Sequence, residues 1–395
     1  MADKGKILQN LMSKSNFKKV SSLKKLIKLE KTSEELVPAP KNLVPLHFTS
    51  NAYYSLYSPT VCAYMAHKCG CTASSINDFA TLRYSKEFKR ACRVLSMQDL
   101  YGYHINCKPL FGEKVGKYYA YGITYKNAKL LDAELKKYRD EKKALLVKVI
   151  KRINKTLNPI GITILEKEVF TSSQYKDCSI TEKHVAKILA SKIIDKFKTP
   201  LEIIEFLKGS LAIDSCEGDL RFLKEQENSY FLEDLAKVLY NKYTLLQPKE
   251  RLEDAKTFIE LGKKYGAISS YKINITSYDE EFLSNTASVL LENGFNAVTI
   301  KFDGVLDDCV SKVVDYFYDK GILAVSLYRI GLPRQLMPTK ELSEKLYNNA
   351  MAIVGSSVSS LSDIKDSFFG ENTIKLCPNL LKRVEIFSNI AKKGN

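Results

Sequence analysis

The feature that most constrains the fold of this chain is a unit that occurs four times: a helix, a glycine, and then a short apolar strand. Glycine often ends a helix because it adopts the left-handed backbone conformation without steric cost. Strands that are apolar throughout are typical of parallel sheets covered by helices. The unit therefore predicts an α/β fold whose sheet is either doubly wound or closed into a barrel. The glycines are Gly70, Gly266, Gly294 and Gly321, and the strands that follow them are 71–76, 267–270, 296–300 and 322–327.

Two regions lie outside this pattern. Residues 126–250 are expected to be almost entirely helical and are interpreted as an insertion into the α/β core. Residues 1–35 are expected to form an amphipathic, lysine-rich helix, which prolines separate from a strand at 43–48. The predicted helices of the insertion are 127–154, a second that begins at the cap Thr181, and 231–240. The predicted organisation is a basic helical arm (1–40), the first part of the core (41–125), the insertion (126–250), and the second part of the core with a C-terminal helix (251–395).

The composition fits a folded protein in a reducing compartment. The chain has 395 residues, of which 45% are hydrophobic. No stretch approaches the roughly 18 uninterrupted apolar residues of a membrane span, and the N-terminal residues lack the apolar segment of a secretory signal. The nine cysteines include no C-x-x-C pair, which disfavours a common zinc site and favours reduced thiols. We therefore expect a cytoplasmic protein that does not contact a membrane.

The net charge of +16 is concentrated in two predicted helices. Residues 1–31 carry nine lysines against two acidic residues, and residues 126–155 carry eleven basic residues against four acidic ones. One interpretation is a basic face for nucleic acid or an acidic partner. The other is a solvated lysine-rich face, which is the simpler interpretation because Lys greatly outnumbers Arg in the chain.

Several motifs together resemble the polymerase and histidinol phosphatase (PHP) family. These motifs are His47-Phe48-Thr49-Ser50 at the end of the first strand, Tyr57-Ser58-Pro59-Thr60 at a helix start, Asp78-Phe79 after the next strand, Tyr101-Gly102-Tyr103-His104, Thr181-Glu182-Lys183-His184, and Pro333-Arg334-Gln335. The resemblance implies a distorted (β/α)7 TIM-like barrel of the PHP type, with the strands near His47, Asp78, His104, Ile300 and Leu327 ending at one mouth. In active members, His and Asp/Glu ligands at this mouth hold divalent metals that activate water and polarise a phosphate ester.

The sequence departs from the family pattern at nearly every implied ligand. Thr49 and Phe79 stand where the family has His, and Arg329 stands at an acidic position. His104 aligns with a family Glu, and Tyr119 with a family His. The resemblance leaves His47, Asp78 and His104 as vestigial metal-site positions, and His184 as a candidate rim residue. With four His in the whole chain, we expect no multi-metal centre and no cofactor, although a single weakly bound Zn, Mn or Fe ion is an alternative.

Arg334 and Arg329 are candidate anion-binding residues, because a guanidinium at the mouth binds phosphate or carboxylate without a metal. The alternative is that they pair with nearby acids such as Asp303 or Asp307. The residues that resemble metal ligands also have an alternative, structural interpretation. In this interpretation Asp78 caps a strand-end turn, and His47 forms a hydrogen bond inside the mouth.

Three hypotheses on function follow. The first is a PHP-like protein that has lost most metal ligands and now has a binding or structural role. The second is a metal-dependent phosphoesterase with a reduced or rearranged site. The third is nucleic-acid binding through the basic helices. The sequence identifies no confident catalytic residue and leaves the partner unknown.

Overall fold

The structure is a computed structural model of the chain. Within the residues that it describes, no helix is both long and apolar enough to cross a lipid bilayer. The described residues are 4–11, 15–32, 41–50, 57–171, 179–213, 221–224, 228, 230–302, 306–327, 329–330, 341–358 and 363–393.

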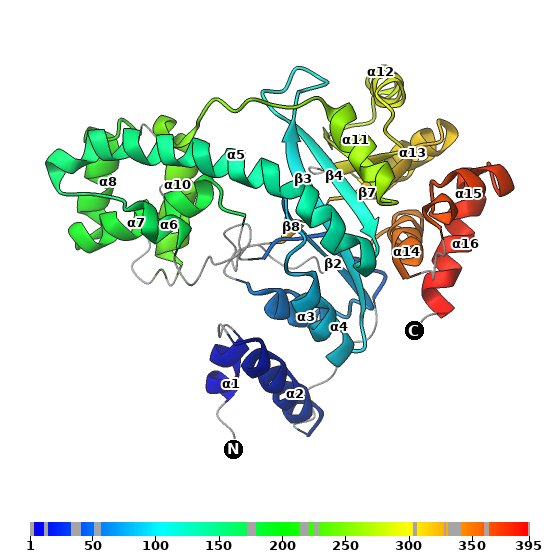
Figure 1. Cartoon of the computed structure of the whole chain (residues 1–395), viewed down its shortest axis with the longest axis horizontal. Coiled ribbons are helices and arrows are strands. Elements are labelled where there is room, and N and C mark those ends of the chain that lie inside the picture. The colour runs from blue at the N-terminus through cyan, green and yellow to red at the C-terminus, as the bar shows by residue number, and fades with distance from the viewer. Residues whose placement is uncertain are drawn as a thin grey trace.

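An eight-stranded sheet forms the centre of the protein, with the strand order β7-β6-β5-β4-β3-β2-β1-β8 (Figure 1). β7 and β8 are separated by only two residues, yet β7 pairs with β6 and β8 pairs with β1 at the opposite edge. Consecutive strands thus join both edges of the sheet, which curls it into a barrel of the predicted α/β kind. The strands are β1 (His47–Phe48), β2 (Ala73–Phe79), β3 (Gln98–Cys107), β4 (Gly116–Ile123), β5 (Ile268–Ile275), β6 (Ala297–Phe302), β7 (Leu323–Ser326) and β8 (Arg329–Ile330).

The sheet differs from the expected parallel arrangement at β4, which runs antiparallel to both β3 and β5. Only residues 108–115 connect β3 to β4, and a connection of this length cannot hold the crossover that a parallel pair needs. Because β4 reverses the direction twice, the other strands all point the same way. Their C-terminal ends therefore lie at one mouth of the barrel, as expected.

The four helix–glycine–strand units are present. Gly70, Gly266, Gly294 and Gly321 all have positive φ angles, between 70° and 85°, so each ends its helix in the left-handed conformation. The expected strand 43–48 is shorter than predicted, since only its last two residues pair with the sheet. The helix that precedes Gly266 begins after the cap Asp254. The helices of these units and the helix after β2 are α3 (Pro59–Lys68), α4 (Ser85–Val94), α11 (Ala255–Lys264), α12 (Glu280–Glu292) and α13 (Asp307–Asp319).

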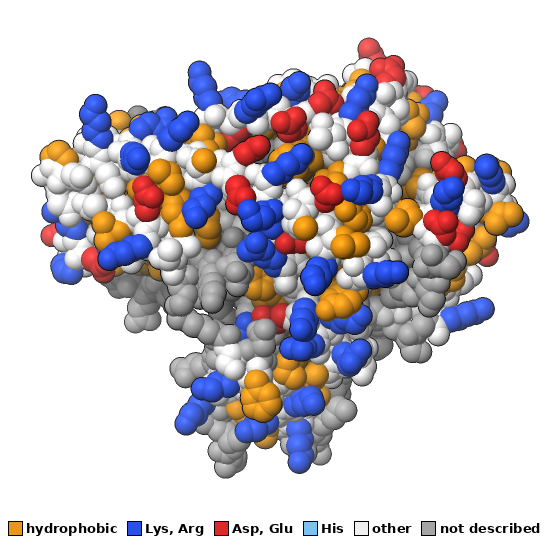
Figure 2. Space-filling model, in the orientation of Figure 1, with side chains coloured by type: hydrophobic (Ala, Val, Ile, Leu, Met, Phe, Trp, Pro, Cys, Tyr) orange, Lys and Arg blue, Asp and Glu red, His pale blue; other side chains and the backbone are white. Residues whose placement is uncertain are grey.

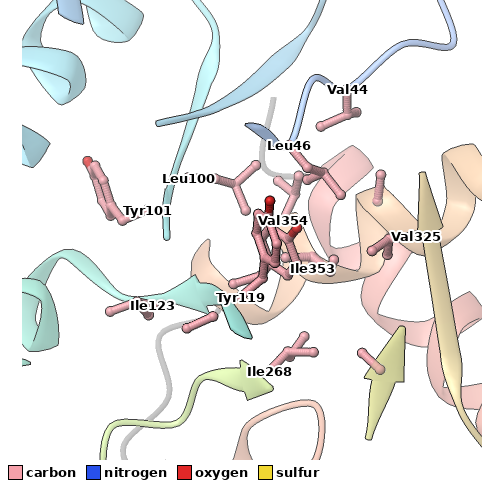
Figure 3. Packing of buried hydrophobic residues seen from close by; sticks show 14 of the residues in the cluster. Val44, Leu46, Leu100, Tyr101, Tyr119, Ile123, Ile268, Val325, Ile353 and Val354 are labelled. Carbon is pink, nitrogen blue, oxygen red and sulfur yellow. The ribbon is translucent and has the colours of Figure 1, made fainter. Parts of the chain in front are cut away.

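One helix covers the end of the barrel opposite the mouth. α14 (Glu344–Val358) contacts β3, β4 and β7 and packs along α16 (Leu380–Lys393), which α15 (Glu371–Leu376) precedes. Figure 3 shows Ile353 and Val354 of α14 among buried side chains that belong to different strands or to the segment before β1. Several of these side chains lie near the N-terminal ends of parallel strands: Leu46, Leu100 and Ile268. α14 therefore closes the bottom of the barrel with apolar side chains.

The insertion has an apolar core of its own. α5 (Tyr125–Leu157) leaves the barrel and runs into the insertion (Figure 1). Its first half contributes Leu131 and Leu135 to the core around the sheet, whereas its second half contributes Leu146 and Ile150 to a second core. That second core contains only residues from 146 to 246. Its other helices are α6 (Glu166–Phe170), α7 (Glu182–Lys196), α8 (Pro200–Gly209) and α10 (Phe231–Lys242).

The N-terminal helices, α1 (Lys4–Leu11) and α2 (Asn16–Thr32), dock on the barrel (Figure 1). α2 contacts α3 and α4, and its Leu23 and Leu26 are completely buried. The buried Lys19 Nζ donates to both carboxylate oxygens of Glu87 on α4, at 2.9 and 2.8 Å. Glu87 also accepts from the N–H and hydroxyl of Thr60 at the start of α3. Both oxygens of the buried Glu87 carboxylate therefore accept hydrogen bonds.

Replacing Lys19 with alanine should lower the free energy of unfolding by about 3–5 kcal/mol, because the Glu87 carboxylate would stay buried without its cation. The matched control is Lys24→Ala on the exposed face of the same helix, which should change stability by less than about 0.5 kcal/mol. Urea denaturation followed by circular dichroism measures both. Equal midpoints for the two variants would show that this ion pair does not hold α2 on the barrel.

Candidate functional site

Two histidines face each other inside the barrel. The ring centroids of His47 on β1 and His104 on β3 lie 4.9 Å apart, and both rings contact Tyr119 of β4 at 5.1 and 5.6 Å. β1 and β4 are not neighbours in the sheet, so the contact between His47 and Tyr119 crosses the interior. All three side chains are buried, with at most 3% of their surface exposed. The structure thus brings together two of the three vestigial metal-site positions.

Aromatic and polar side chains surround the two histidines in the barrel interior. The Phe79 ring contacts His104 edge-on at 5.7 Å, and the His104 Nδ1 lies 3.3 Å from the Asn77 Oδ1. On the opposite side of the interior, the hydroxyl of Thr299 on β6 hydrogen-bonds with those of Tyr121 and Ser270, at 3.1 and 2.7 Å. The described interior is therefore filled with aromatic and polar side chains near the two histidines.

Asp78 points away from these histidines. Because side chains alternate along a strand, Asn77 and Phe79 face the interior and Asp78 faces outward, toward α3. Its carboxylate accepts hydrogen bonds from the backbone N–H and the hydroxyl of Ser50, both at 2.8 Å. Burial raises the pKa of Asp78 to about 7, against the lowering effect of the two Ser50 hydrogen bonds. In this position Asp78 fixes the chain that follows β1.

The described residues do not fit a divalent metal centre. No three His, Cys, Asp or Glu side chains converge among them in a geometry that could hold an ion. His47 and His104 supply two imidazoles, but Phe79 and Tyr119 occupy the neighbouring interior positions, and the nearest expected carboxylate, Asp78, binds Ser50 instead. A metal cluster needs several carboxylates to balance its charge.

A buried lysine ammonium lies over the Phe79 ring at the end of β2. Lys142 of α5 is 6% exposed, forms ion pairs with Glu182 and Glu250, and lies over the Phe79 ring with its Nζ 5.5 Å from the centroid. Glu250 is held in turn by the Asn106 side-chain amide at 3.0 Å, at the end of β3. The cation links the insertion, the return segment to α11, and the mouth of the barrel. Nothing in the sequence distinguishes Lys142 from the other basic residues of its helix.

The remaining candidate residues lie in different places. His184 is completely buried in the first turn of α7, where its Nδ1 accepts a hydrogen bond from the Thr181 N–H at 3.0 Å. It therefore caps its own helix. Arg329 pairs with His47 in the register of β8 and β1, but its side chain lies outside the described residues, as does the whole of Arg334.

Part of the charge in the two basic segments is internal. Lys19 and Lys142 form buried ion pairs, and the buried Arg139 donates to Asp132 and to the Ala80 carbonyl. Figure 2 shows the remaining Lys and Arg side chains spread over the visible face, with acidic side chains among them. This distribution is typical of a solvated face.

Three lysines at the mouth were not identified from the sequence. Each of them is two residues nearer the mouth than an interior residue of the same strand. The pairs are Lys117 with Tyr119, Lys272 with Ser270, and Lys301 with Thr299. They therefore lie on the interior face of three neighbouring strands. The sequence contains this two-residue spacing, but the spacing identifies the three lysines only when the interior residues of each strand are known.

The hydrogen-bonded carboxyl of Asp78 gives a prediction for pH dependence. Its pKa is raised in the folded state, so the protonated form stabilises the fold fully below about pH 4 and this contribution is lost as the pH rises through 7. In Asp78→Asn, the amide can still accept from the Ser50 N–H and donate to the Ser50 hydroxyl. The variant should match the wild type at low pH and become more stable than it by about 2–4 kcal/mol at pH 8. Denaturation curves at pH 4.5 to 8 test this, and parallel pH profiles would contradict it.

No family model and no curated protein match this chain. Two solved structures share its fold. A protein of Bifidobacterium adolescentis, described as a metal-dependent phosphoesterase, has a TM-score of 0.53 and 11% identity, over 80% of this chain and 98% of that one. An amidohydrolase of Chromobacterium violaceum, with bound sulfate and no metal, has a TM-score of 0.52 and 13% identity, over 78% of this chain and 96% of that one. The chain therefore shares a TIM-like α/β fold with these two proteins.

Proposed function

We propose that this chain is a non-catalytic relative of the metal-dependent phosphoesterases that binds a small anion, such as a phosphate ester or a carboxylate, at the mouth of its barrel. The observation that carries the proposal is the set of three lysines on the interior face of neighbouring strands, Lys117, Lys272 and Lys301. Together they place positive charge on the interior face of β4, β5 and β6, toward the mouth of the barrel.

The surroundings of two of these lysines are suited to an organic anion. Lys117 and Lys272 line a pocket of about 260 Å³, together with the apolar side chains of Phe111, Val115 and Phe282. Lys272 Nζ also donates to the Asn274 side chain at 2.9 Å, which holds the ammonium at the pocket wall. A few fixed polar groups in an otherwise apolar hollow are the usual composition of a ligand site.

One acidic residue belongs to the same pocket. Burial alone would raise the pKa of Glu113, but hydrogen bonds from the Tyr271 hydroxyl and from the backbone N–H groups of Leu110 and Phe111 lower it below its usual range. Glu113 is therefore charged, and its hydrogen bonds direct the carboxylate toward these donors. Its carboxylate thus has its own donors, while Lys117 and Lys272 line the same pocket.

The packed interior supports a binding role over hydrolysis. Metal-assisted hydrolysis needs a cation that lowers the pKa of a bound water and neutralises charge in the transition state. The rings of Phe79 and Tyr119 stand against the two histidines at the level where ligands would be required. The sulfate described in the amidohydrolase that shares this fold is bound without a metal, which is compatible with anion binding in such a barrel.

Inorganic phosphate should raise the thermal unfolding midpoint of the wild type beyond the effect of chloride at equal ionic strength, since a ligand of the folded state stabilises it. The double variant Lys117→Gln, Lys272→Gln should lose most of this shift. The matched control is Lys126→Gln, Lys129→Gln, which removes two exposed lysines of α5 and should keep it. An equal loss in both double variants would show that the phosphate effect is a general response to charge and would overturn the proposal.

The absence of turnover is a separate prediction. Purified protein should not hydrolyse p-nitrophenyl phosphate above the rate without protein, with or without added Mn²⁺ or Zn²⁺. Metal-stimulated turnover that disappears in His47→Ala would overturn the non-catalytic assignment and favour a phosphoesterase with a rearranged site. The phosphate-shift measurement is independent of this result, so binding and catalysis are tested separately.

A further inference from the structure

A second pocket lies where the insertion joins the barrel, apart from the mouth lysines. Its volume is about 470 Å³, within the range of small-molecule sites. α5 forms one wall, and the return segment 249–253 forms the other. The ends of β2 and β3 contribute Phe79 and Asn106. None of the residues that line this pocket belongs to the mouth pocket around Lys117 and Lys272.

The barrel side of this pocket is aromatic. Phe79, Tyr138 and Phe258 all line it, and the rings of Tyr138 and Phe258 lie 5.1 Å apart. Leu145 and Leu252 extend the apolar lining along both walls. Aromatic rings favour a planar aromatic ligand, since stacked or edge-to-face ring pairs contribute beyond simple burial.

The charges of the pocket are separated along α5. Glu141 and Glu253 lie toward the barrel and interact electrostatically with Lys137, which offsets part of their charge. Lys148 lies about 10 Å farther along the helix axis, toward the insertion. The return segment runs back from the insertion to the barrel, so its basic residue Lys249 lies at the insertion end, and Glu253 at the barrel end.

The basic end is available to an anion. Within the described part of the chain, Lys148, Lys249 and Arg251 form no salt bridge. The buried Lys142, by contrast, is already neutralised by Glu182 and Glu250. A ligand anion would therefore meet the three rim cations and not Lys142.

We propose that this pocket binds a small aromatic anion, with its ring against Phe79, Tyr138 and Phe258 and its negative group at Lys148, Lys249 and Arg251. The ligand class is an aromatic ring that carries a carboxylate, phosphate or phosphonate. Such a ligand contacts the insertion and the barrel at once.

Phenylphosphonate is a suitable probe because it carries both features and contains no ester bond. Calorimetry should detect saturable binding of phenylphosphonate to the full chain. Phenol, which lacks the anion, and inorganic phosphate, which lacks the ring, should bind this pocket at least about tenfold more weakly, as expected for the loss of about 1.4 kcal/mol. Equal affinity for phenylphosphonate and inorganic phosphate in the Lys117→Gln, Lys272→Gln variant, whose mouth site is removed, would overturn the proposal.

A variant that fills the pocket tests whether the ligand binds there. Ala144 lines the pocket, so in Ala144→Trp the indole should fill it and reduce the affinity for phenylphosphonate at least about tenfold. Ala133→Trp, on an exposed position of the same helix outside the lining, should bind as the wild type does. The natural chain contains no tryptophan, so the indole emission of each variant reports whether its ring is buried.

Two further variants separate this site from the mouth. Lys249→Gln, Arg251→Gln should weaken phenylphosphonate binding, whereas Lys117→Gln, Lys272→Gln should retain it. Loss of binding in the mouth variant, together with unchanged binding in Ala144→Trp, would assign the aromatic anion to the mouth and overturn this proposal. It would leave the proposed mouth site intact.

Discussion

Two successive short strands bring the opposite edges of the sheet together, and the interior of the barrel depends on this arrangement. β7 pairs with β6, and β8 pairs with β1 two residues later, so side chains from strands distant in the sequence must share one interior. In this interior the rings of His47, His104 and Tyr119 contact each other. Dense packing leaves little room for a cluster of metal ions in this interior, since protein interiors are as closely packed as organic crystals. The mouth and the junction with the insertion have pockets outside this packed interior.

Positively charged side chains lie at both of these places. At the mouth, three lysines follow the interior residues of β4, β5 and β6. At the junction, Lys148, Lys249 and Arg251 line a pocket whose barrel side is aromatic. The buried basic residues have another role, because Lys19 and Lys142 join helices to the barrel through carboxylates. The high net charge of the chain thus combines internal links, candidate binding groups and solvated surface.

The sequence predicted the parts of this structure that depend on neighbouring residues. The glycine at the end of each helix, the Ser58 and Thr181 caps, and the long helix of the insertion all have local causes. β4 was missed because a hairpin strand rich in tyrosine carries no helix–glycine signal. The outward direction of Asp78 depends on a strand register that motifs do not contain. The role of Lys142 depends on Glu182 and Glu250, which are 40 and 108 residues away in the chain, and no local pattern indicates such a contact.

The position of Lys142 has a consequence for how the protein holds together. In a metal-centred protein, the cation that neutralises clustered carboxylates is exchangeable, and a chelator removes it. Here the cation between Glu182 and Glu250 is covalently part of the chain and is buried beside Phe79. This link between the insertion and the barrel therefore needs no metal ion, and it forms as the chain folds.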